Sequence, residues 1–191
     1  MNALSASPLL SRRQLHACLA VAMLFVFMPV APVAAATSPL GFTLGKTTQR
    51  EVEHSLPRGA IKDSSLSVMT GGPWFEIDPT TFDFDGPEKV VLVFDTDQRL
   101  VSVLLTIAKG RFRDVLSDLR SKYSGESQDI NNFMQNGKAM FRSGDDWIFF
   151  NAPHLSFSLT LTYATDKFWR EARRRSEEEA TQKRQQERGK L

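Results

Sequence analysis

The sequence predicts an α+β fold, a two-layer sandwich in which helices cover one face of an antiparallel β-meander. One observation is a stripe of apolar side chains at the i, i+3, i+4, i+7 and i+11 spacing of a single helix face. These residues are Phe112, Val115, Leu116, Leu119 and Tyr123. The other is an alternation of apolar side chains with Ser and Thr over residues 155–163, at Leu155, Phe157, Leu159, Leu161 and Tyr163. A strand of this kind has one dry and one wet face, so it belongs to a sheet covered on one side.

A secretory signal is predicted to precede this domain. Arg12 and Arg13 give a positively charged start, residues 17–33 an apolar stretch, and residues 34–36 the small-residue pattern A-x-A. This order is typical of a cleaved signal peptide over residues 1–36, with the mature chain beginning at about Thr37.

Three other interpretations compete with a cleaved signal. A retained membrane anchor needs about 20 apolar residues, and Pro29 and Pro32 interrupt the end of this run. The twin arginines also fit an export address read by a receptor. Cys18 precedes a hydrophobic region instead of following one, so it makes a poor lipobox.

Composition excludes several classes of function. Cys18 is the only cysteine and would leave with the signal, so the mature domain is expected to have no disulfide. Without Arg12 and Arg13, the 24 basic residues become 22, equal to the 22 acidic residues. A balanced charge removes the main electrostatic argument for binding nucleic acid.

The first half of the domain is expected to be a helix followed by strands. Residues 48–51 (Thr-Gln-Arg-Glu) fit a capping box that opens a helix, and Pro57 ends it. Residues 58–73 are predicted to be weak strand and loop. Strands are predicted at 74–77, 89–94 and 100–107, the last two joined by an Asp-rich turn at 95–98.

The second half repeats this order. The helix over residues 112–123 is expected to stop at Ser124-Gly125, and strands follow around 139–142, 146–150 and 155–163. The domain at 37–165 is therefore predicted to contain two tandem α-β-β-β units, at 39–107 and 109–163.

Residues 166–191 are predicted to form a charged C-terminal helix or tail. Opposite charges lie four residues apart in three pairs, Glu171–Arg175, Arg175–Glu179 and Glu179–Lys183. One interpretation is a solvated helix supported by its own ion pairs. The other is a docking arm, either for a partner or, through the basic cluster Arg173, Arg174 and Arg175, for peripheral contact with an anionic membrane.

No catalytic, cofactor or metal site is predicted. Residues 41–47 resemble a phosphate loop but have three residues between the glycines instead of four. The mature chain offers only His54 and His154 as imidazole bases, neither within a recognisable motif.

Aromatic residues are the remaining signal. The run at 147–150 is too continuous for a strand with one wet face, so it needs cover from the C-terminal helix or from a partner. The candidate partner-binding residues are Trp74, Trp147, Phe149, Phe168 and Trp169.

Two short motifs carry a resemblance to periplasmic helix-plus-meander families. Residues 44–52 (LGKTTQREV) resemble an opening helix of the form LG-x-T-T-x-x-E-V, and residues 94–100 (FDTDQRL) a hairpin of the form F-D-x-D-x-x-L. Residues 112–125, with 119–123 ending like L-x-x-K-Y, resemble the start of a second copy. Over residues 39–163 the chain thus resembles the BamE (SmpA/OmlA) family and the β-lactamase-inhibitory protein family. The chain departs from BamE in having no usable lipobox and two units.

The resemblance implies a protein-binding or envelope-assembly role without catalysis. Together with the signal, it leads us to expect a periplasmic or secreted protein that binds another envelope or secreted protein. Two alternatives are a carrier with an apolar cavity for a small ligand or lipid, and an envelope hydrolase.

Overall fold

The computed structural model describes residues 37–189, all of which belong to one compact unit, Ala34–Leu191. The predicted signal at 1–36 lies outside the described residues. The first half of the unit consists of α1 (Gln49–Ser55), β1 (Ile61–Leu66), β2 (Pro73–Ile77), β3 (Pro87–Phe94) and β4 (Leu100–Ala108). The second half consists of α2 (Phe112–Lys122), β5 (Ser124–Asn131), β6 (Asn136–Ser143), β7 (Asp146–Ala152) and β8 (Ser158–Ala164), and α3 (Asp166–Arg188) follows.

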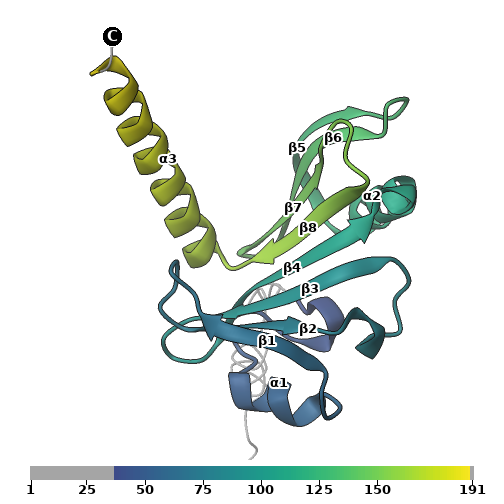
Figure 1. Ribbon diagram of the computed structural model, residues 1–191. Helices are drawn as coiled ribbons and strands as arrows, with labels where there is room; N and C mark the ends of the chain where they lie inside the picture. Colours follow the sequence, from purple (N-terminus) through teal and green to yellow (C-terminus); the bar gives the residue numbers. More distant parts are fainter. Residues whose placement is uncertain (1–36, 190–191) are drawn as a thin grey trace, which may run out of the picture. The chain divides into compact units, whose positions relative to one another are not determined.

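The eight strands form one antiparallel sheet in the order β1-β2-β3-β4-β8-β7-β6-β5 (Figure 1). Two four-stranded meanders therefore meet where β4 pairs with β8, from Ser102–Ala164 to Ala108–Ser158. The predicted α+β class is confirmed. Each half has one helix followed by four strands, however, instead of the three strands that the sequence predicted.

The additional strand in the second half is β5, which the sequence did not predict. Its residues are SGESQDIN, a polar segment that is mostly exposed at the edge of the sheet. It forms because each of its residues from Gln128 to Asn131 pairs with β6. Gly125 consequently does not stop α2. The helix ends at Lys122, and its cap Tyr123 is already extended.

The hydrophobic core lies between the sheet and the first two helices. Phe112 of α2 is fully buried, and its ring lies 5.3 Å from that of Phe150 on β7. Val52 of α1 is fully buried in the same core. Four of the five residues in the predicted apolar stripe, from Phe112 to Leu119, are buried, and the fifth, Tyr123, is half-buried just after the end of α2. Helices α1 and α2 cover the same face of the sheet.

Helix α1 begins at the predicted capping box. Thr48 Oγ1 accepts a hydrogen bond from Glu51 N at 3.3 Å, and Glu51 Oε2 accepts one from Thr48 N at 2.7 Å. These two bonds satisfy backbone donors that the first turn of a helix leaves free. The bond from Thr48 N, followed by a bond from the Thr48 hydroxyl to Glu51 Oε2 at 2.9 Å, lowers the pKa of Glu51.

The predicted strand at 155–163 begins later than expected. Strand β8 starts at Ser158, whereas Leu155 and Phe157 lie in the preceding turn with 87% and 92% of their surface exposed. Leu155 has a positive φ of 60°, and Ser156 Oγ accepts from Ser158 N, so a local turn competes with strand pairing here. The alternation holds from Leu159 onward.

Candidate functional site

One face of the sheet is not covered by α1 or α2, and we call it the open face. On β4, Val103, Leu105 and Ile107 are buried in the core, so the alternating residues between them point to the opposite side. Leu104 is one of these and has 37% of its surface exposed.

The open face carries an apolar row across the middle of the sheet. The register places Leu104 opposite Val91 on one side and Thr162 on the other, and Thr162 opposite Phe149. Phe149 in turn lies opposite Met140. All of these residues except Leu104 are half-buried.

Charged residues flank the row. On the side of the sheet toward β1, Glu76 and Lys89 form an ion pair at 2.5 Å. Toward the β5 end, Lys138 pairs in register with Asp129. An apolar centre with a polar rim is the usual composition of a protein–protein interface.

Helix α3 contacts the open face through an aromatic cluster that consists of Trp147, Phe149 and Trp169. The ring centroids of Phe149 and Trp169 are 4.0 Å apart, and Trp169 lies 6.4 Å from Trp147. The rings of Trp147 and Phe149 stack at 6.2 Å. Adjacent residues of a strand point to opposite faces, so Phe149 meets α3 while Phe150 meets α2. Helices α1 and α2 thus cover one face of the sheet, as predicted, and the C-terminal helix α3 contacts the other face.

A hydrogen bond fixes the start of α3 beside this cluster. Thr165 caps the helix by accepting from Phe168 N, and the indole Nε1 of Trp147 donates to Asp166 Oδ1 at 3.0 Å. The Trp147 bond, followed by the bond from Arg170, lowers the pKa of Asp166. The guanidinium carbon of Arg142 lies 4.2 Å from the Trp147 ring centroid, a cation–π contact on the other side of the cluster.

A groove of about 650 Å³ runs between α3 and the open face of the second meander. Phe149 and Met140 line it from the sheet, and Trp169 and Ala172 line it from the helix. Lys138 and Asp129 also line it, at the strands farthest from β4. The groove therefore continues the apolar row of the open face.

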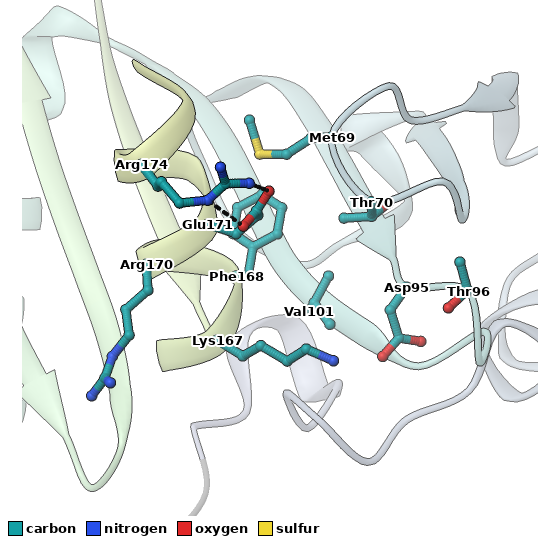
Figure 2. A pocket seen from close by; sticks show the side chains of 10 residues that line it. All are labelled: Met69, Thr70, Asp95, Thr96, Val101, Lys167, Phe168, Arg170, Glu171 and Arg174. Carbon is teal, nitrogen blue, oxygen red and sulfur yellow. Dashed lines mark hydrogen bonds and ion pairs between the residues drawn. The ribbon is translucent and has the colours of Figure 1, made fainter. Parts of the chain in front are cut away.

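A second hollow of about 420 Å³ lies on the other flank of α3, against the first meander. Figure 2 shows the Phe168 ring and the side chains of Val101 and Met69 directed into it, with Glu171 and Arg174 bonded to each other at its rim. Met69 belongs to the loop between β1 and β2. Arg175 Nη1 donates to the carbonyl of Val68 in this loop at 3.0 Å, so α3 is held by both meanders.

The basic cluster of α3 is paired within its own helix. Arg173 binds Glu177 at 2.8 Å, and Arg175 binds Glu171 at 2.8 Å. Arg174 binds Glu171 at 2.7 Å and also Glu178. Bonds from Arg174, then Arg175, lower the pKa of Glu171 to about 2. Of the three predicted i,i+4 pairs, only Glu171–Arg175 forms among the described residues. Arg175 turns to Glu171 and the Val68 carbonyl and so does not pair with Glu179.

The structure brings three of the five predicted aromatic residues together. Trp147, Phe149 and Trp169 form the cluster, whereas Phe168 makes no ring contact with it and lines both the groove and the hollow on the other flank of α3. Trp74 is on the open face of β2, in register with Val93. The cover predicted for the run at 147–150 comes from Trp169 of α3.

The sequence did not single out Val91, Leu104 and Met140 as surface residues. Strands β3 and β4 are almost continuously apolar, so their two faces look alike in the sequence. Only the partners across the sheet show which residues point away from the core.

The two histidines lie apart from this face. His54 Nδ1 is 2.7 Å from the carbonyl of Arg50 on its own helix, and His154 Nδ1 is 2.9 Å from Asn136 Nδ2. Within residues 37–189 no group of three or more His, Cys, Asp or Glu side chains could hold a metal ion. Over the same residues, none of the helices has the length and apolar character needed to cross a membrane.

Comparison of the chain with protein-family models, with curated proteins and with solved structures finds no match. The likeness to the BamE and β-lactamase-inhibitory protein families therefore stays a prediction from short motifs.

Proposed function

We propose that this chain is an exported, non-catalytic interaction module of the cell envelope that binds another protein with the open face of its sheet. The single observation that carries the proposal is the apolar row on this face, in which Leu104 lies at the centre of the sheet with 37% of its surface exposed. Large apolar side chains in the middle of an exposed, polar-rimmed surface favour a protein partner.

The shape of the surface supports this proposal. Strand backbone hydrogen bonds hold the row rigid, so a partner does not have to order it on binding. Helix α3 forms one wall of the groove, and Trp169 presents a large aromatic surface at that wall. Trp side chains beside a desolvated pocket are typical anchors of binding energy.

Export is the second part of the proposal. It rests on the signal predicted over residues 1–36. A periplasmic or secreted location would place the open face among envelope proteins. Peripheral contact of α3 with anionic lipid stays a lesser proposal, because Arg173, Arg174 and Arg175 are already paired with glutamates.

The alternative of a ligand carrier with a cavity under α1 and α2 is less well supported. The space between these helices and the sheet is filled by side chains such as Phe112, Leu116 and Phe150, each at most 2% exposed. The hydrolase alternative required His54 or His154 to face Ser, Asp or Glu across a cleft. Their hydrogen bonds instead go to the Arg50 carbonyl and to Asn136.

Affinity capture with matched surface variants tests the proposal. The mature protein, Leu104→Arg and Ser117→Arg would each be used as bait in an envelope extract. Leu104 lies on the open face, whereas Ser117 is exposed on α2 at the opposite face. Both variants gain the same charge and the same side chain.

We expect a defined protein to be enriched by the mature protein and by Ser117→Arg, and lost with Leu104→Arg. Recovery of the same proteins by all three baits would contradict binding at the open face. Circular dichroism of each bait would show that the loss is not caused by unfolding.

A further inference from the structure

Thr37 makes a buried contact that joins the two halves of the domain. The backbone nitrogen of Thr37 donates to Asp146 Oδ2 at 3.1 Å, across 109 positions of the sequence. Thr37 has 3% of its surface exposed and Asp146 9%. The carbonyl of Thr37 accepts from Leu44 N at 3.0 Å, so both backbone groups of Thr37 are fixed.

Among the described residues, the Asp146 carboxylate has no ion-pair partner. Burial raises its pKa, the hydrogen bond from the Thr37 backbone lowers it, and the neighbouring carboxylate of Asp145 raises it again. None of the salt bridges within residues 37–189 involves Asp146. A buried carboxylate normally has a charged partner, because a neutral donor compensates for only part of its lost hydration.

Thr37, which donates to the Asp146 carboxylate, is also the first residue after the predicted cleavage site. We propose that removal of residues 1–36 turns the Thr37 nitrogen from an amide into an ammonium group that forms a buried ion pair with Asp146. This inference rests on the cleavage that is part of the proposed function, and it adds an event that completes the fold.

The chemistry of the step is a simple hydrolysis. Water adds to the carbonyl carbon of the Ala36–Thr37 peptide bond, and the C–N bond breaks. The oxygen of the water completes a carboxyl group on Ala36. The proton that this carboxyl group releases is taken up by the new amine of Thr37, which becomes –NH₃⁺. No oxidant, reductant or cofactor is involved.

The ion pair would act on the open face through β7. Asp146 is the first residue of β7 and points to the core side, whereas the next residue, Trp147, belongs to the aromatic cluster. Trp147 in turn holds Asp166 at the start of α3. Fixing Asp146 therefore fixes the strand end from which the α3 contact is built.

The test compares two chains that differ by one residue. One begins at Thr37 with a free amine, and the other keeps Ala36, so that the Thr37 nitrogen stays an amide. Each is made with Asp146, with Asp146→Asn, and with Asp145→Asn, where Asp145 is an exposed neighbouring carboxylate that serves as the matched control.

Urea unfolding gives the unfolding equilibrium constant of each chain. We expect Ala36 to raise this constant about 10- to 100-fold with Asp146 present, the usual range for a hydrogen bond to a charged group. The increase should persist in Asp145→Asn and disappear in Asp146→Asn. An effect of Ala36 that is equal with and without the Asp146 carboxylate would overturn the proposal.

A second measurement covers the case in which Asp146→Asn does not fold. The α-amine of Thr37 should titrate in the unmutated free-amine chain above the ordinary value of about 8, because the carboxylate stabilises the ammonium form. A ¹⁵N NMR titration that gives the ordinary value would also overturn the proposal.

N-terminal sequencing of the exported protein separates this inference from the proposed function. A first residue other than Thr37 would remove the ion pair, whatever the protein binds. A first residue of Thr37 with the expected unfolding data, but without capture of any partner, would contradict the binding role and leave the ion pair standing.

Discussion

Replacing Trp169 by Ala tests whether the aromatic cluster holds α3 on the open face. Trp169 is the cluster's only member from α3, and its centroid lies 4.0 Å from that of Phe149. Returning roughly 100 Å² of apolar surface to water costs about 2.5 kcal/mol at 25 cal/mol per Å². Loss of the ring pair adds about 1 kcal/mol. We therefore expect the docking of α3 to weaken by roughly 3 kcal/mol, over a hundredfold in its opening equilibrium.

Amide hydrogen exchange of α3 measures this opening directly. Because α3 contributes no residue to the buried core, its first turns should exchange over a hundredfold faster in Trp169→Ala while core strands such as β4 keep their protection. Trp74→Ala is the control, since Trp74 lies on the same face but has no ring contact with α3 among the described residues. Unchanged exchange in Trp169→Ala, or an equal change in Trp74→Ala, would refute the reasoning.

Three further perturbations follow from the structure. Phe112→Ala should lower the free energy of unfolding by about 3–5 kcal/mol, because it empties a fully buried site beside Phe150; a cost in urea below 1 kcal/mol would contradict the packing. Thr48→Ala should cost about 0.5–2 kcal/mol, because Glu51 N loses its side-chain acceptor, and thermal unfolding with Thr48→Ser as the control measures it. Lowering the pH from 4.5 to 2 should reduce the helicity of α3, because the ion pairs of Glu171 lower the pKa of this carboxyl group to about 2. The stability that the ionised group contributes is fully present above its ordinary pKa and is lost as the pH falls to the lowered pKa. Circular dichroism should show this loss, and Glu171→Gln should make it smaller, because Asp166, Glu177 and Glu178 still titrate in the variant; an identical titration in both chains would contradict the prediction.

Local signals in the sequence predicted several elements correctly. The capping box placed the start of α1, the apolar stripe identified α2, and the run of charges predicted α3. Each of these patterns depends on residues within a few positions of one another. The physical chemistry that sets them is therefore contained in a short segment.

Features set by distant contacts were missed or misplaced. Strand β5 is polar and exists through its pairing with β6, so its own residues do not indicate a strand. Leu155 and Phe157 continue the alternation of β8, yet a Ser156 turn leaves them outside the sheet. The contact between Thr37 and Asp146 joins residues 109 positions apart.

The candidate site was only partly visible for the same reason. An aromatic run predicted that Trp147 and Phe149 need cover, and Trp169 was among the candidates. The uniform apolar character of β3 and β4 concealed which residues face outward. The register across the sheet identifies them as Val91 and Leu104.

Site-specific photo-crosslinking in the envelope tests most directly whether the open face binds a protein. A photoreactive side chain would replace Leu104 or Met140 on this face, or Ser117 on the outer side of α2. The account predicts one adduct of the same partner from both open-face positions and none from Ser117. Adducts from Ser117 alone, or none from either open-face position, would contradict it.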